Sequence, residues 1–133
     1  MRILVVVLSL WMAATSAFAQ DSDAIEDVIG SQLQAFNNRD VSEAWQYASP
    51  NIKRLFGSSD NFGMMVQRGY PMVWDNADVR FLELRDVRGN LWQKVMVRDA
   101  QGGLHILDYQ MVETADGWQI NGVQLLPAPD VGA

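Results

Sequence analysis

Cysteine is absent from the 133 residues, and His105 is the one histidine. A chain without cysteine forms no disulfide and holds no metal through thiolates, and a single histidine argues against a zinc site. The glycine pair Gly102-Gly103 indicates a turn, because it lacks the strand–loop–helix setting of a nucleotide site. We therefore expect no bound metal and no cofactor, and the hydrophobic core has to stabilise the fold without cross-links.

Basic residues are also scarce. The chain has 10 Lys and Arg against 16 Asp and Glu, which gives a formal net charge of −6 at pH 7. An acidic chain is repelled at long range by nucleic-acid phosphates and by anionic lipid headgroups. We therefore expect no nucleic-acid partner.

Long apolar runs are missing except at the start of the chain. Arg2 precedes an apolar stretch over Ile3–Ala13, which is too short to span a bilayer. Ala17-Phe18-Ala19 then matches the small-x-small pattern of a cleavage site. Residues 1–19 are thus predicted to be a signal peptide cleaved before Gln20, giving a periplasmic or secreted protein without stable membrane insertion after cleavage. An uncleaved N-terminal anchor is the alternative.

Residues 20–126 are predicted to form a single domain that begins with helices. Apolar residues at helical spacing predict three helices, over Asp23–Asn38, over Val41–Ala48 and from Ser58 or Ser59 to the residues before Pro71. One more helical turn is expected over Asn51–Phe56, and a loop over 71–77. Asp40 is expected to cap the second helix, because a Glu three residues later completes a capping box.

After residue 78 the apolar spacing changes to two, which predicts strands. The expected strands are Asp78–Val87, Leu91–Asp99 and a hairpin over Leu104–Leu125, with a turn at 114–117. Short turns between consecutive strands indicate an antiparallel meander, so the fold class is α+β: three N-terminal helices packed on a four-stranded antiparallel meander sheet. Residues 127–133 hold two prolines and a glycine and are expected to be a flexible tail.

The loop lengths predict which strand residues lie opposite one another. A three-residue loop at 101–103 places Val97 opposite Leu107 and Asp99 opposite His105. A four-residue loop there would break the apolar face, so the first register is preferred on burial grounds. A four-residue loop at 114–117 places Met111 opposite Ile120. The side chains expected to be mostly buried are Phe36, Trp45, Phe62, Val66, Tyr109, Met111, Trp118 and Ile120.

The opposite face of the sheet is not uniformly polar. Its apolar members are expected to form a patch whose polar neighbours make a rim, as in many interfaces. Two copies could meet through this face as a homodimer, unless a loop covers it. The apolar residues expected there are Trp92, Met96, Ile106, Val112, Val123 and Leu125.

Several short segments together resemble the family catalogued as domain of unknown function 4864. The resemblance extends over about Ile25–Leu126 and rests on the following segments: Ala48-Ser49-Pro50, Ile52, Phe56-Gly57, Asn61-Phe62, Met65-Val66, Gly69-Tyr70-Pro71, Tyr109 and the run from Gly117 to Val123. It implies an NTF2-like or cystatin-like α+β cone, in which a curved antiparallel sheet wraps helices. The family has no assigned activity, so the resemblance carries over no catalytic residue.

Two pairs of side chains are candidates for catalysis. His105 beside Asp99 could act as a general base, or the two could be a cross-strand pair that serves structure. Asp40 could act together with a tyrosine, or it could simply be the helix cap already described. Either pair would suit a small lyase, isomerase or hydrolase.

Aromatic residues are numerous and could line an apolar pocket for a small apolar ligand, or fill an ordinary core. We therefore expect a non-catalytic binding or accessory domain, with the small enzyme and the structural homodimer as alternatives. The candidate ligand-binding residues are Trp45, Tyr47, Tyr70, Trp74 and Tyr109.

Overall fold

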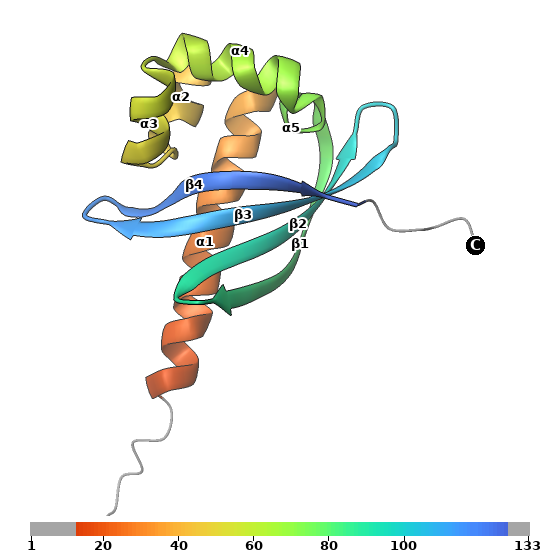
Figure 1. Cartoon of the computed structure of the whole chain (residues 1–133). Helices are drawn as coiled ribbons and strands as arrows, with labels where there is room; N and C mark the ends of the chain where they lie inside the picture. The colour runs from red at the N-terminus through yellow and green to blue at the C-terminus, as the bar shows by residue number, and fades with distance from the viewer. Residues whose placement is uncertain (1–12, 128–133) are drawn as a thin grey trace, which may run out of the picture.

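The computed structural model describes residues 13–127, which fold as five helices followed by a four-stranded antiparallel sheet in the order β1-β2-β3-β4. In Figure 1, α1 crosses one face of the sheet, and α2 to α4 gather beside its β4 edge. The predicted α+β class, with helices packed on a four-stranded antiparallel sheet, is confirmed. The elements are α1 Ala13–Asn37, α2 Val41–Gln46, α3 Pro50–Phe56, α4 Ser59–Gly69, α5 Pro71–Trp74, β1 Asn76–Val87, β2 Asn90–Asp99, β3 Leu104–Thr114 and β4 Gly117–Leu126.

The helix α1 supplies the central apolar stripe of the core. Ile25, Ile29, Leu33 and Phe36 recur at helical spacing and are all buried. The side chains of residues 17–20 are exposed, so the helix continues past the expected cleavage position without contributing a buried side chain there. Cleavage stays a prediction, and most of the expected signal peptide lies outside the described residues, as does most of the expected tail. None of the helices within residues 13–127 is long and apolar enough to span a membrane.

The prediction of a loop over 71–77 is wrong. Pro71 begins the short helix α5, where its missing N–H costs nothing because the first turn of a helix has no partner for it. Met72 and Val73 of this helix are buried in the core, and β1 begins at Asn76. The chain therefore enters the sheet directly from a helical turn.

The pairing of β2 with β3 differs from the prediction by two residues. Val97 lies opposite His105, and Val95 lies opposite Leu107. The reason is a wider turn over residues 99–103, in which the Asp99 side chain accepts from the backbone N–H groups of Gln101 and Gly103. Because side chains alternate between faces, a shift of two leaves every residue of these strands on its expected face.

A bulge in the pairing of β3 with β4 changes which residues face the core. Met111 lies opposite Ile120 as predicted, but the register shifts after Gln110, so that Tyr109 lies opposite Val123. The shift transfers Val123 and Leu125 from the far face to the core face, and their predicted place in the far-face patch is wrong. That face keeps Trp92, Met96, Ile106 and Val112, beside the ion pairs Arg85–Asp108 and Lys94–Glu83. A homodimer through it stays a prediction.

The predicted core is largely confirmed, but two tryptophans are only partly buried. Trp45 packs its ring 5.5 Å from that of Phe62, and Trp118 lies near the β3–β4 turn, so both sit at the margin of the core. The expected residues that are buried are Phe36, Phe62, Val66, Tyr109, Met111 and Ile120.

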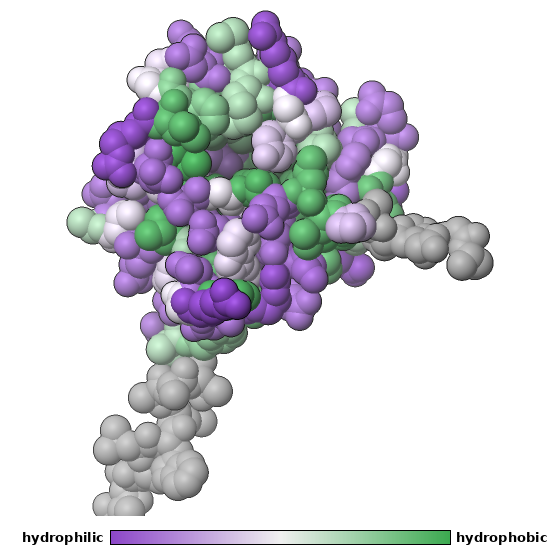
Figure 2. All heavy atoms as spheres, in the orientation of Figure 1, coloured by the Kyte–Doolittle hydropathy of each residue, from purple (hydrophilic) through white to green (hydrophobic). Residues whose placement is uncertain are grey.

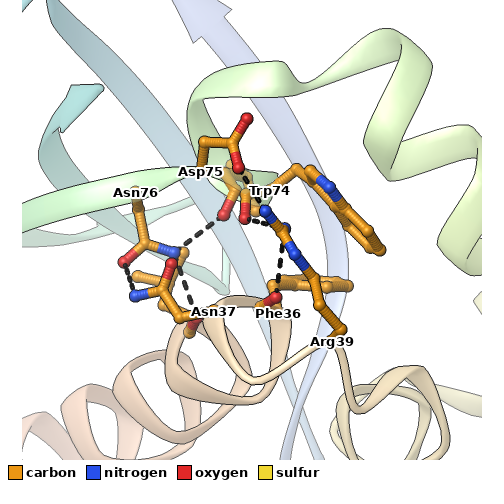
Figure 3. A network of polar contacts seen from close by, with 8 residues as sticks. Phe36, Asn37, Arg39, Trp74, Asp75 and Asn76 are labelled. Carbon is orange, nitrogen blue, oxygen red and sulfur yellow. Dashed lines mark hydrogen bonds and ion pairs between the residues drawn. The ribbon is translucent and has the colours of Figure 1, made fainter. Parts of the chain in front are cut away.

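A network of polar contacts joins the end of α1 to the start of the sheet (Figure 3). Arg39 donates to the backbone carbonyl of Trp74 at 2.7 Å, pairs with Asp75, and lies 4.4 Å from the centre of the Trp74 ring. The buried Asn76 donates to the backbone carbonyls of Leu33 at 3.0 Å and Val73 at 2.7 Å. These contacts fix the last turns of α1, which carry side chains of the cavity described next.

Candidate functional site

A cavity of about 260 Å³ lies between the helical layer and strands β3 and β4. Figure 2 shows hydrophobic side chains gathered around a hollow on the face where the helices meet the sheet. The wall is mostly apolar, and it draws on α1, α3, α4, α5 and the two strands. Its residues are Gln32, Phe36, Ala48, Ile52, Leu55, Phe56, Phe62, Met65, Val66, Tyr70, Val73, Tyr109, Ile120, Gly122 and Val123.

The helix α3 forms the outer wall of the cavity and is only partly packed against the core, through Ile52 and Phe56. Ser49 caps its start and Gly57, with a φ of 78°, ends it in the left-handed conformation that suits glycine. None of its residues is buried, and Leu55 is 72% exposed although it lines the cavity. The mouth of the cavity therefore lies at α3.

Short backbone pairing holds α3 against the edge of the sheet. The N–H of Ser49 donates to the carbonyl of Ile120, and the N–H of Ile120 donates to the carbonyl of Tyr47, each at 2.8 Å. Ala48 thereby forms a parallel bridge with Ile120. The pairing sets the start of α3 beside β4, one residue before the bulge that turns Val123 toward the cavity.

Two tyrosines and one glutamine are the polar side chains of the wall. The Tyr70 hydroxyl donates to the backbone carbonyl of Val123 at 3.2 Å, and Gln32 Nε2 donates to the carbonyl of Ala44 at 3.1 Å. Tyr109 is 1% exposed, and its hydroxyl has no hydrogen-bond partner among the described residues. Burial, with a smaller contribution from Tyr70, raises the pKa of Tyr109 far above its usual value, so the phenol stays neutral.

Of the five candidate ligand-binding residues, the structure brings Tyr70 and Tyr109 together at the cavity. Trp45 and Trp74 instead pack beside Phe62 and Phe36, with ring centres 5.5 and 6.1 Å apart. Tyr47 lies apart from the cavity and donates to Glu43 Oε1 at 2.9 Å, a hydrogen bond that raises its pKa.

His105 and Asp99 do contact each other, with 2.7 Å between Nε2 and Oδ2. They meet diagonally across the β2–β3 turn, because the actual register places His105 opposite Val97. The hydrogen bond from His105, followed by that from the N–H of Gly103, lowers the pKa of Asp99. Neither side chain lines the cavity, so the geometry fits a pair that stabilises the β2–β3 turn.

Asp40 caps α2 as predicted, accepting from the N–H of Glu43 at 3.0 Å. Asp40, Glu43 and Tyr47 line a second pocket of about 180 Å³, whose other residues are mostly polar. Within residues 13–127 no group of three or more His, Asp or Glu side chains is arranged to hold a metal ion.

Gln32 was not among the expected site residues, although the sequence carries a sign of it. It lies three residues after Ile29 and four before Phe36, on the apolar stripe of α1, where a polar side chain breaks the pattern. In the structure it is buried and lines the cavity. A lone polar residue within an apolar stripe is the kind of feature that marks a specific contact.

The family model described as Domain of unknown function (DUF4864) matches residues 18–133. Neither a curated protein nor a solved structure matches the chain.

Proposed function

We propose that this chain, which belongs to the family described as Domain of unknown function (DUF4864), binds a small, mainly apolar molecule in the cavity between its helices and its sheet. The observation that carries the proposal is Tyr109, which lines this mostly apolar cavity and whose buried hydroxyl lacks a protein partner within the described residues. Ligand sites in proteins combine such a wall with a few polar groups that fix orientation.

The chemistry of the wall favours holding a molecule over transforming it. No carboxylate, imidazole or amine is among the described residues that line the cavity. The raised pKa of Tyr109 keeps its hydroxyl protonated, so it is not available as a base near neutral pH. The small-enzyme alternative is less well supported, since both of its candidate carboxylates lie away from this cavity.

The volume limits the size of the bound part of the ligand. An engineered apolar cavity of about 150 Å³ binds benzene, so a cavity of 260 Å³ accommodates roughly ten non-hydrogen atoms. A longer molecule could extend through the mouth at α3, past the exposed Leu55.

We place this binding outside the cytoplasm, after removal of residues 1–19. The exposure of residues 17–20 supports this part of the proposal, because these side chains are not buried and, from residue 17 onward, the first buried core residue of α1 is Ile25. Intact-mass measurement on exported protein tests it: a chain that begins at Gln20 is expected, and a chain that retains Met1 would contradict it.

The binding itself is tested by titrating ¹⁵N-labelled protein with α-methylstyrene, a neutral apolar probe, and following the backbone amides by NMR. Saturable shifts are expected for amides around the cavity, including those of Tyr109 and Val123. Native mass spectrometry of protein purified without denaturation complements the titration, because it detects a ligand that is retained.

Two matched variants separate cavity binding from non-specific surface binding. Val123→Phe places a larger side chain in the cavity and should abolish the shifts, whereas Val112→Phe makes the same change on the opposite face of the sheet and should leave them intact. Equal shifts in both variants, or none in the unmodified protein up to the solubility limit of the probe, would refute the proposed function.

A further inference from the structure

Three polar side chains belong to the cavity wall, and two of them already donate hydrogen bonds within the protein. Gln32 donates to Ala44, and Tyr70 donates to Val123. The Tyr109 hydroxyl remains without a partner in the described part of the chain and is shielded from the surrounding solvent. Because Tyr109 also lines the cavity, a molecule bound there is the candidate partner for this hydroxyl.

Charge is missing from the same wall. Among the described lining residues none is Asp, Glu, Lys, Arg or His. An ion taken from water into an apolar site without an opposite charge loses a large hydration energy that nothing there replaces. The basic side chains nearest in sequence, Lys53 and Arg54, belong to α3 at the mouth, and they do not line the cavity.

From these two observations we infer that the ligand is a neutral molecule with one hydrogen-bond-accepting oxygen, such as the carbonyl of a ketone or an ester, which accepts from the Tyr109 hydroxyl. The inference rests on the proposed function and adds to it the chemical class of the ligand. Carboxylates are excluded from the interior of the cavity, and plain hydrocarbons bind more weakly because they leave the hydroxyl without a partner.

Three probes of the same shape and size separate these classes. Acetophenone carries a carbonyl oxygen, α-methylstyrene has a methylene group in its place, and benzoate carries a carboxylate. Each is titrated by NMR into the unmodified chain and into Tyr109→Phe, which removes the hydroxyl alone. Binding of α-methylstyrene to Tyr109→Phe also shows that the variant keeps its cavity.

Acetophenone is expected to bind about three- to tenfold more tightly than α-methylstyrene, the usual value of one neutral hydrogen bond. Tyr109→Phe should remove this preference by weakening acetophenone binding while leaving α-methylstyrene unchanged. Benzoate should bind at least about a hundredfold more weakly than acetophenone.

The possible failures are distinguishable. If acetophenone and α-methylstyrene bind equally to both proteins, the inference is overturned while the proposed function stands. If benzoate binds as well as acetophenone, the inference is overturned too, and loss of that binding in Lys53→Ala or Arg54→Ala would locate it at the mouth. If none of the three binds, the proposed function fails as well.

Discussion

Replacing Tyr109 with phenylalanine should stabilise the protein. The hydroxyl is buried and has no partner among the described residues, so folding removes it from water without a compensating hydrogen bond. A buried polar group without a partner lowers the free energy of unfolding by about 1–3 kcal/mol. Removing the hydroxyl should raise that free energy by about 1 kcal/mol, the low end of this range, because phenylalanine makes no contact that tyrosine lacks. A core residue gaining stability by losing an atom is the reverse of the usual outcome of a core substitution.

Tyr70→Phe is the matched control. It removes the same atom from a neighbouring tyrosine of the same wall, but there the hydroxyl donates to the carbonyl of Val123. Its loss should lower the free energy of unfolding by about 1 kcal/mol. The free energies of unfolding of the two variants should thus differ from each other by about 2 kcal/mol, with the unmodified chain between them.

Urea unfolding followed by tryptophan fluorescence measures both effects. The midpoints should move in opposite directions while the slopes stay equal, since neither change alters the surface exposed on unfolding. If Tyr109→Phe proves as destabilising as Tyr70→Phe, the hydroxyl has a strong partner in the folded protein, and the reasoning about its role in the cavity is refuted.

Three further predictions concern packing and charge. Gly63→Ala should lower the free energy of unfolding by about 1–3 kcal/mol, because the new Cβ would lie 2.6 Å from Val41 Cγ1. In the control Gly69→Ala the new Cβ meets nothing within 4 Å, so thermal melts should show no loss of stability for this variant. Phe36→Ala should cost about 3–5 kcal/mol in urea unfolding, as expected for an emptied core site, while Leu55→Ala at the exposed mouth should change stability by less than about 0.5 kcal/mol. The hydrogen bonds from His105 and Gly103 keep the pKa of Asp99 below its ordinary value of 3.8. The ionised carboxylate therefore stabilises the folded chain above pH 3.8, and this stabilisation is lost as the pH falls through the lower folded-state pKa. Asp99→Asn should therefore be less stable than the unmodified chain at pH 6, and the gap should narrow at about pH 3, whereas a constant gap would contradict this account.

The sequence predicts the helices and the faces of the strands because both depend on local periodicity. Ile25, Ile29 and Leu33 repeat at the helical period, and Val95 and Val97 at the strand period, so each pattern reports burial directly. Even the wrong pairing of β2 with β3 preserved these faces, because the error was an even number of residues.

The features that build the cavity were not predictable in this way. The bulge beside Gln110 breaks the alternation of β4 and turns Val123 inward. Asn121-Gly122 lies at this point of the strand, where a glycine suits a bulge, but the apolar periodicity alone does not reveal the shift. The bridge between Ala48 and Ile120 joins segments far apart in the chain. Tyr109 could be named as a candidate from its residue type, but the missing partner of its hydroxyl is a property of the assembled core alone.

Because α3 is only partly buried, the rate of ligand exchange can differ from the rate at which the whole domain unfolds. A segment without a fully buried side chain can open locally at a free energy well below that of global unfolding. Amide hydrogens of α3 should then exchange with deuterium far faster than those of β3 next to Tyr109. A molecule in the cavity could accordingly enter and leave many times during the lifetime of a single folded chain.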